Sequence, residues 1–134
     1  MKILIGYDGS EQARHALTWA AQAFPGSRLC VISVAPALEA SPKIADAIDP
    51  TSGLDVHRRQ LEEAVATLGL SGIQADTLLK AGNPAEEIIN AAADGQFDLI
   101  LVGIHGMEAL RRFLIGSVAD RVVRHATVPV LVVR

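Results

Sequence analysis

The stretch KILIGYDGSEQARHALTWAAQAF, residues 2–24, decides the fold, because it combines the signals of a strand, a short loop and a helix. Residues 2–7 form a nearly continuous apolar run, which is typical of a strand buried on both faces of a sheet. Ser10 is a favourable N-cap residue, and apolar residues then recur on one helical face up to Phe24. The Pro-Gly pair that follows predicts the end of this helix. A buried strand leading directly into an amphipathic helix is the building unit of parallel sheets.

The same alternation of short apolar runs and helix-period segments continues to residue 134. Further strands are expected at 29–34, 73–80, 97–103 and 128–133, and further helices at 54–69, from Asn83-Pro84 onward and within 108–126. Five strands joined by four crossover helices predict a doubly wound parallel α/β sheet with helices on both faces. The alternating pattern of 73–80 predicts an edge strand.

Two features concern the organisation of the chain. The segment 36–53 has neither the strand nor the helix period and is too long for an ordinary connection, which predicts a functional loop. No internal repeat or shift in composition divides the sequence. We therefore expect residues 1–134 to form one domain.

The composition excludes several functional classes. A net charge of −3 argues against a nucleic-acid-binding protein, because such proteins need a basic face to displace counterions. Cys30 is the single cysteine, so an internal disulfide is excluded, and a small buried strand residue is expected there. The first apolar run is too short for a signal peptide, and no apolar stretch approaches the ~18 residues that span a bilayer. We expect a soluble, cytoplasmic protein that has no membrane partner.

Ligands of doubly wound sheets bind beyond the carboxyl ends of the strands, where the strand order reverses. The first strand ends in GYDGS (6–10) and the fourth in GIHG (103–106). If these strands are neighbours, Asp8 and the glycine loop face one crevice, where glycine lets backbone N–H groups approach an anion. Gly116 and Ser117 then open a helix whose first N–H groups and positive dipole end favour phosphate. The spacing G-x-x-G-x9-G-[ST] therefore predicts a phosphate-binding site.

This combination of segments resembles the universal stress protein family, and specifically its ATP-binding branch. The resemblance covers essentially the whole chain and rests on ILIGYDGSEQARHAL, GNPAEEII, FDLILVGIHG and GSVADRVVRHATVPVLVVR. Nucleotide-binding members carry the motif found here at Gly103, Gly106, Gly116 and Ser117. The resemblance implies a five-stranded sheet of order 3-2-1-4-5, which places the first and fourth strands side by side. It also implies a homodimer that pairs through the C-terminal strand.

The resemblance further implies that the ligand is an adenine nucleotide bound together with Mg²⁺. ATP is the expected nucleotide, and AMP and ADP are the alternatives. Asp8 would lie by the adenosine part, preceded by Gly6 and Tyr7, and Val34 would meet adenine through its backbone. The ribose and phosphate region would be lined by Gly103, His105 and Gly106, and the phosphates would be wrapped by Gly116, Ser117, Val118 and Ala119. The family often has a hydroxyl residue in place of Ala119, so one phosphate contact worth about 1 kcal/mol would be lost. It usually has Ser or Thr in place of Ile104.

Several of these residues also have simpler structural interpretations. Asp8 could start the turn before the first helix. His105 could bond only to its own loop, and it has no second His or Cys at metal-ligand spacing, so no metal site is expected. Arg111 and Arg112 could reach phosphates or form a solvated face. The remaining histidines are expected to be solvated or to cap helices: His15, His57 and His125.

The residues favour a binding protein over an enzyme, and no catalytic residue is expected. No nucleophile–base pair is evident, and no P-loop GxxxxGK[ST] is present because Lys does not precede Ser117. A receiver-type domain would need an Asp after the third strand, where this chain has 79–82, LKAG. An adenylating enzyme would need SGGxDS or HIGH. The sequence thus predicts an ATP-binding stress-response or regulatory protein; a dimeric interaction module without nucleotide and a slow or autophosphorylating ATPase remain alternatives.

Overall fold

The computed structural model describes residues 1–36, 54–104 and 115–134, and within them five strands form one parallel sheet. The strands are β1 (Lys2–Gly6), β2 (Arg28–Ala35), β3 (Ala75–Ala81), β4 (Leu99–Gly103) and β5 (Val130–Val133). The helices are α1 (Glu11–Ala23), α3 (Leu54–Gly69), α4 (Pro84–Asp94) and α5 (Ser117–His125). The order β3-β2-β1-β4-β5 confirms the predicted fold class and the edge position of β3. None of the helices in these ranges is long and apolar enough to cross a membrane.

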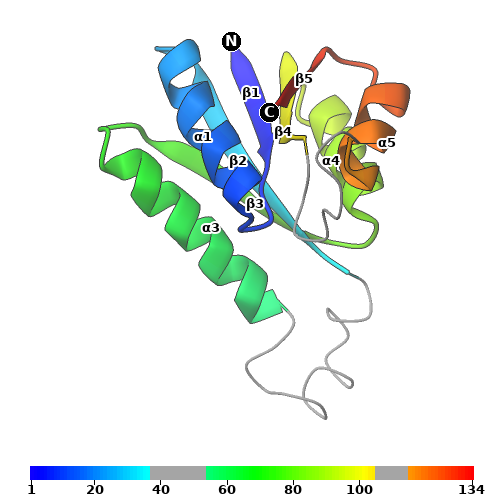
Figure 1. Ribbon diagram of the computed structural model, residues 1–134, viewed down its shortest axis with the longest axis horizontal. Coiled ribbons are helices and arrows are strands. Elements are labelled where there is room, and N and C mark those ends of the chain that lie inside the picture. The colour runs from blue at the N-terminus through cyan, green and yellow to red at the C-terminus, as the bar shows by residue number, and fades with distance from the viewer. Residues whose placement is uncertain (37–53, 105–114) are drawn as a thin grey trace.

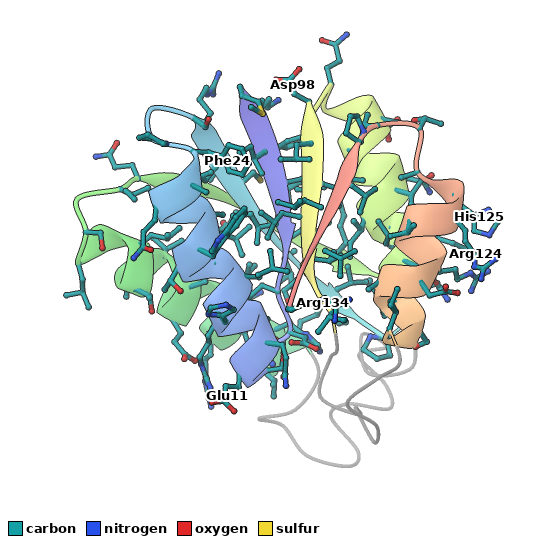
Figure 2. The ribbon with its side chains drawn as sticks, turned by 45° about the horizontal axis from the view of Figure 1, so that its top comes forward. Glu11, Phe24, Asp98, Arg124, His125 and Arg134 are labelled. Atoms are coloured by element: carbon teal, nitrogen blue, oxygen red, sulfur yellow. The ribbon has the colours of Figure 1, made fainter. Side chains whose placement is uncertain are left out.

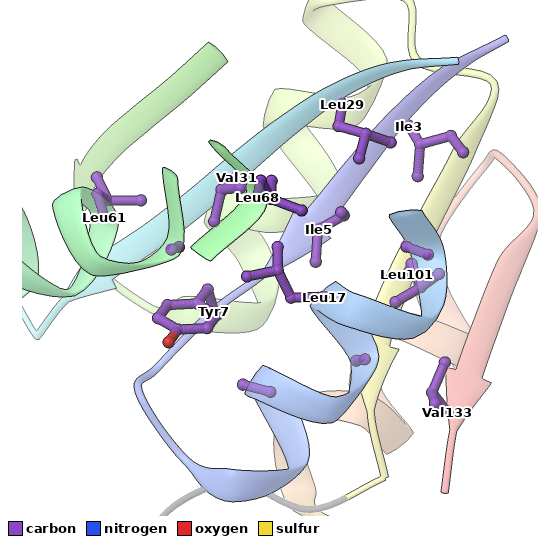
Figure 3. Packing of buried hydrophobic residues seen from close by; sticks show 14 residues of the cluster. Ile3, Ile5, Tyr7, Leu17, Leu29, Val31, Leu61, Leu68, Leu101 and Val133 are labelled. Carbon is purple, nitrogen blue, oxygen red and sulfur yellow. The ribbon is translucent and has the colours of Figure 1, made fainter. Parts of the chain in front are cut away.

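The sheet is buried on both faces, because α1 and α3 cover one side and α4 and α5 cover the other (Figure 1). Successive strand residues point to opposite faces. Leu29 and Val31 of β2 therefore pack in the cluster under α1 and α3, which Figure 3 shows. Cys30 and Ile32 pack in the cluster under α4 and α5. Cys30 is buried, as predicted.

The predicted helix starts are confirmed by their caps. The Ser10 hydroxyl accepts a hydrogen bond from the Ala13 amide at 3.1 Å, and the Asn83 side chain accepts one from the Glu86 amide at 3.1 Å. Pro84 stands in the first turn of α4, where its missing N–H costs nothing. α3 has the predicted bounds.

Three strands, β3, β4 and β5, begin two residues later than the apolar runs suggest. Phe97 donates its amide to the Ala92 carbonyl, and Ile73 donates to Leu68, so both residues close the preceding helix instead of joining the sheet. Apolar residues at these points pack as part of a turn, which periodicity does not distinguish from a strand. Of the predicted functional loop, 37–53 lies outside the described residues, as does the 108–114 part of the predicted fourth helix region.

The topology brings the two important strand ends together. β1 pairs with β4 in parallel, with Ile5 opposite Leu101, and with β2 on its other side. The chain therefore leaves β1 and β4 at the same edge of the sheet, at the point where the strand order reverses. Every described helix begins at this edge, since each follows a parallel strand in a right-handed crossover.

Candidate functional site

A cavity of about 790 Å³ opens beyond the carboxyl ends of β1, β2 and β4. Its volume lies within the ~300–1,000 Å³ of ordinary small-molecule sites. It is lined by strand ends and by the first turns of all four described helices. The predicted site residues that line it are Gly6, Tyr7, Asp8, Val34, Gly103, Gly116, Ser117, Val118 and Ala119. The other two, His105 and Gly106, lie outside the described residues.

The end of β4 and the start of α5 are tied together at the rim of this cavity. Ile104 donates its amide to the Val133 carbonyl at 2.8 Å, and Gly116 donates its amide to the Ile104 carbonyl at 2.6 Å. Residues twelve positions apart are thus held in direct contact. The first and last parts of the glycine motif consequently face the same space.

The N-terminus of α5 is suited to an anion. Gly116 is its N-cap residue, and within the described part of the chain no side chain caps the helix. The amides of the first helical turn have no acceptor inside a helix, and the helix dipole places its positive end there. Ser117 adds a hydroxyl donor at the same point. This combination favours a phosphate group.

Asp8 forms the turn before α1 and also lines the cavity. Its carboxylate accepts the Ser10 amide at 2.9 Å, which forms the turn before α1, and Gly9 completes the turn with a φ of +78°. Asp8 also lines the cavity, and it is the one carboxylate among the described lining residues. The turn fixes the position of this carboxylate relative to the end of β1.

Tyr7 lines the cavity, but its side chain packs in the hydrophobic core. The ring lies among Leu17, Leu61 and the other residues of the cluster under α1 and α3 (Figure 3). Burial raises the pKa of the Tyr7 hydroxyl, and the nearby Glu63 carboxylate raises it further. Within the described residues that hydroxyl has no hydrogen-bond partner of acceptable geometry. The Tyr7 amide continues the ladder by donating to the Ile32 carbonyl at 2.9 Å.

Gly103 has a packing role in addition to its place in the cavity wall. A Cβ atom at this position would lie 3.1 Å from the backbone carbonyl carbon and oxygen of Gln12 in α1. Backbone atoms cannot move away as a flexible side chain can. The absence of a side chain at Gly103 therefore allows α1 to approach β4 closely.

Sequence reasoning missed a group of polar side chains in the wall formed by β2 and α3. Ser33 is 1% exposed, and its hydroxyl lies 3.1 Å from His57 Nδ1 and 3.3 Å from Gln60 Oε1. His57 and Gln60 both line the cavity. The prediction that His57 is solvated or cap-like is wrong, because helix α3 places it against Ser33; His15 and His125 are exposed. Ser33 was the available signal, since it is the one polar residue in the run LCVISV.

Arg121 is a further lining residue that the sequence did not single out. It lies four residues after Ser117 and thus on the same side of α5. Its guanidinium lies 3.4 Å from the Glu86 carboxylate of α4. Both side chains are about half exposed, so this pair contributes little to stability and leaves the arginine able to turn toward an anion.

Other candidate sites are weaker. Within residues 1–36, 54–104 and 115–134, no group of three or more His, Cys, Asp or Glu side chains could hold a metal ion. A smaller cavity of about 390 Å³ lies along β3 and α4. Its described charged lining residues are three cations and three anions, so it offers no net attraction for a phosphate: Lys2, Arg28, Lys80, Asp76, Glu87 and Asp94.

Comparison with known proteins adds independent information. The family model described as the universal stress protein family matches residues 1–134. A universal stress protein of Thermus aquaticus is 36% identical over 140 residues, covering 98% of this chain and 97% of the relative. The structure of protein MJ0577 of Methanocaldococcus jannaschii superposes with a TM-score of 0.83 at 26% identity, covering 98% and 94%. The Archaeoglobus fulgidus universal stress protein in complex with dAMP has a TM-score of 0.74 at 24% identity, covering 100% and 98%.

Proposed function

Because the chain belongs to the universal stress protein family, we propose that it is an adenine-nucleotide-binding stress-response protein of the ATP-binding branch. The nucleotide would occupy the cavity at the carboxyl ends of β1, β2 and β4. Solved proteins of this fold carry dAMP, cAMP or AMP, which supports an adenine nucleotide as the ligand class.

One observation carries the proposal: the glycine-capped N-terminus of α5 meets the end of β4 inside a cavity of nucleotide size. The phosphates would bind to the amides of Ser117, Val118 and Ala119, with Arg121 close by. His105 and Gly106 would complete this end of the site. Ala119 is buried and apolar, so its side chain would add no donor to the phosphates.

The adenosine end would lie at β1 and β2. These strands and β4 are neighbours, and adjacent strands are ~4.8 Å apart, so the ends of β2 and β4 are separated by about 10 Å across β1. That span allows a base at Val34 and a phosphate at Gly116. Asp8 would sit between them near the ribose and base, and it is the one carboxylate among the described lining residues that could face a Mg²⁺ accompanying the phosphates.

We propose a binding function and not a primary catalytic one. The described cavity wall holds one carboxylate, Asp8, and one guanidinium, Arg121. Phosphoryl transfer needs a positioned nucleophile and neutralisation of the phosphate charge, which this set alone does not supply. The occupied site would regulate partner choice by a homodimer joined through β5.

The test is titration calorimetry of the purified protein with Mg-ATP, AMP and cyclic AMP, using Gly116→Asp as the variant. The φ of −61° and ψ of 156° at Gly116 suit any residue, and Asp is itself a good N-cap, so this variant keeps the helix. Its carboxylate would stand where a phosphate should bind. Gly69→Asp is the matched control, since Gly69 ends α3 with open space around it.

We expect saturable binding by the natural protein and by Gly69→Asp, and a loss of at least tenfold in affinity for Gly116→Asp. Equal affinity in Gly116→Asp would place the phosphates elsewhere. Absence of binding for every nucleotide would favour the alternative of a dimeric interaction module.

A further inference from the structure

Arg121 is the one lysine or arginine among the described residues that line the cavity. It lies four residues after Ser117, which places it about 6 Å further along the axis of α5. A helical side chain leans toward the N-terminus of its own helix, so the Arg121 side chain lies over the first turn of α5. Its guanidinium is consequently near the end of the helix at which the first phosphate would bind.

The ion pair that Arg121 forms with Glu86 is weakly held. One guanidinium nitrogen donates to the Glu86 carboxylate at 3.4 Å, which is longer than the ~2.7–2.9 Å of a strong charge-assisted hydrogen bond. The two side chains are 51% and 61% exposed, so water screens the attraction between them. Arg124 of the same helix is held better, because its Nε donates to both carboxylate oxygens of Asp120 at 3.1 and 3.0 Å. Arg121 can therefore exchange its partner more easily than Arg124.

The charges around this end of the cavity make a second phosphate depend on Arg121. The first turn of α4, which packs against α5, carries Glu86 and Glu87, and the first turn of α5 carries Asp120. The amides at the start of α5 form a site for one phosphate. A further phosphate beside it would be repelled by these carboxylates. A guanidinium offsets this repulsion well, because its planar N–H groups can donate to two oxygens of one phosphate.

We propose that Arg121 leaves Glu86 to bind the outer phosphates of a nucleoside di- or triphosphate, and that it thereby gives the site a preference for ATP and ADP over AMP. This inference rests on the proposed nucleotide function and states which nucleotides the site prefers. A terminal phosphate offers more acceptor oxygens and more negative charge than the carboxylate that it replaces, so the exchange is favourable. Arg121 would thus be a specificity residue that distinguishes nucleotides by their number of phosphates.

The experiment measures the affinities of AMP, ADP and ATP by calorimetry, at one ionic strength and one Mg²⁺ concentration. The natural protein is compared with Arg121→Gln, which removes the charge, and with Glu86→Gln, which removes the competing carboxylate. Arg124→Gln is the matched control, because it removes the same charge from the same helix at a position that does not line the cavity. Glutamine is a good helix former, and thermal unfolding confirms that each variant is folded.

We expect Arg121→Gln to weaken the binding of ATP and ADP about tenfold or more, the usual effect of losing a hydrogen bond to a charged group, and to change AMP binding by less than about twofold. Glu86→Gln should strengthen ATP binding, because Arg121 no longer has a competing partner, without a comparable gain for AMP. Arg124→Gln should keep the ratio of ATP affinity to AMP affinity that the natural protein has.

Two results would overturn the inference while leaving the proposed function intact. One is an unchanged ratio of ATP affinity to AMP affinity in Arg121→Gln. The other is an equal fall of this ratio in Arg124→Gln, which indicates a long-range effect of net charge and no contact with the outer phosphates. If the natural protein binds none of these nucleotides, the proposed function itself fails, and the inference fails with it.

Discussion

At the scale of single residues, Gly103 serves two purposes that sequence motifs do not separate. The motif predicts a loop that approaches phosphate, and the structure places Gly103 in the cavity wall. The same glycine also lets the α1 backbone at Gln12 come close to β4. A variant at this position therefore changes packing as well as the site, which makes Gly116 the better residue for testing the ligand.

We predict that Gly103→Ala destabilises the fold by ~1–3 kcal/mol, because the new methyl group would lie 3.1 Å from backbone atoms of Gln12. Urea denaturation followed by circular dichroism measures the loss. Gly69→Ala is the control and should be neutral, since no atom lies within 4 Å of the added Cβ. Equal stability of the two variants would contradict the packing role of Gly103.

Cys30 gives a prediction about pH. Burial raises the pKa of its thiol from 9.0 to about 11, with the Asp76 carboxylate contributing in the same direction. Between these values the unfolded chain loses this proton and the native protein keeps it. Unfolding then releases a proton, so stability is present below pH 9 and falls as the pH rises toward 11, by up to ~1.4 kcal/mol per pH unit.

The measurement compares the free energy of unfolding of the natural protein and of Cys30→Ala from pH 8 to 11. The advantage of the natural protein should shrink as the pH rises, because the variant has no thiol to titrate and all other groups are shared. A difference that stays constant over this range would show that the thiol titrates alike in both states.

The sequence could not predict the roles of residues whose contacts lie far away along the chain. Asp8, Gly103 and Gly116 stand out in the sequence because of the apolar runs and the motif spacing, and their place at the cavity was predictable. His57 and Gln60 look like ordinary residues of an amphipathic helix. Their role depends on Ser33, which is 24 residues from His57 and on another element. Periodicity identifies the face of a helix but not the side chain that it meets.

At the scale of secondary-structure elements, helix starts were predicted better than strand starts. Ser10 and Asn83 cap their helices through local hydrogen bonds over three residues, so a short stretch of sequence contains the whole signal. The start of β4 depends on where the Phe97 amide bonds, and it bonds back to α4 at Ala92. An apolar residue fits either arrangement, and the predicted strand was consequently two residues too long.

The predicted homodimer would form by pairing of the edge strand β5 with β5 of a second chain. The Pro129 carbonyl accepts a hydrogen bond from the Ile100 amide, and the Val133 carbonyl accepts one from the Ile104 amide, so both carbonyls point toward β4. The backbone groups of successive strand residues point to opposite edges, so the Val130 N–H points away from β4 to the outer edge of the sheet. We expect a mass of about 28 kDa, twice the 14.2 kDa of one chain, in analytical ultracentrifugation. Val130→Pro removes an outward donor at the first residue of a strand, where proline is tolerated, and should shift the protein to monomer. A natural protein that sediments as a monomer would refute the dimer.

At the scale of the whole molecule, the topology creates the site. Figure 2 shows the side chains of the two helical layers on either side of the sheet, with the labelled Glu11 at the first turn of α1 and Phe24 at its other end. The order β3-β2-β1-β4-β5 makes the ends of β1 and β4 adjacent and opens the cavity between the layers. The doubly wound parallel class was predictable from the alternation of strands and helices, whereas the strand order was predicted only through the resemblance to the family.

The central claim is that an adenine nucleotide binds in the cavity at the carboxyl ends of the strands, and amide chemical shifts test it most directly. Mg-ATP or AMP is titrated into ¹⁵N-labelled protein. We predict saturable shifts at the amides of Asp8, Val34, Gly103 and Ser117, and none at Asn90 beside the smaller cavity. Shifts confined to the smaller cavity, or no saturable shifts at all, would contradict the account.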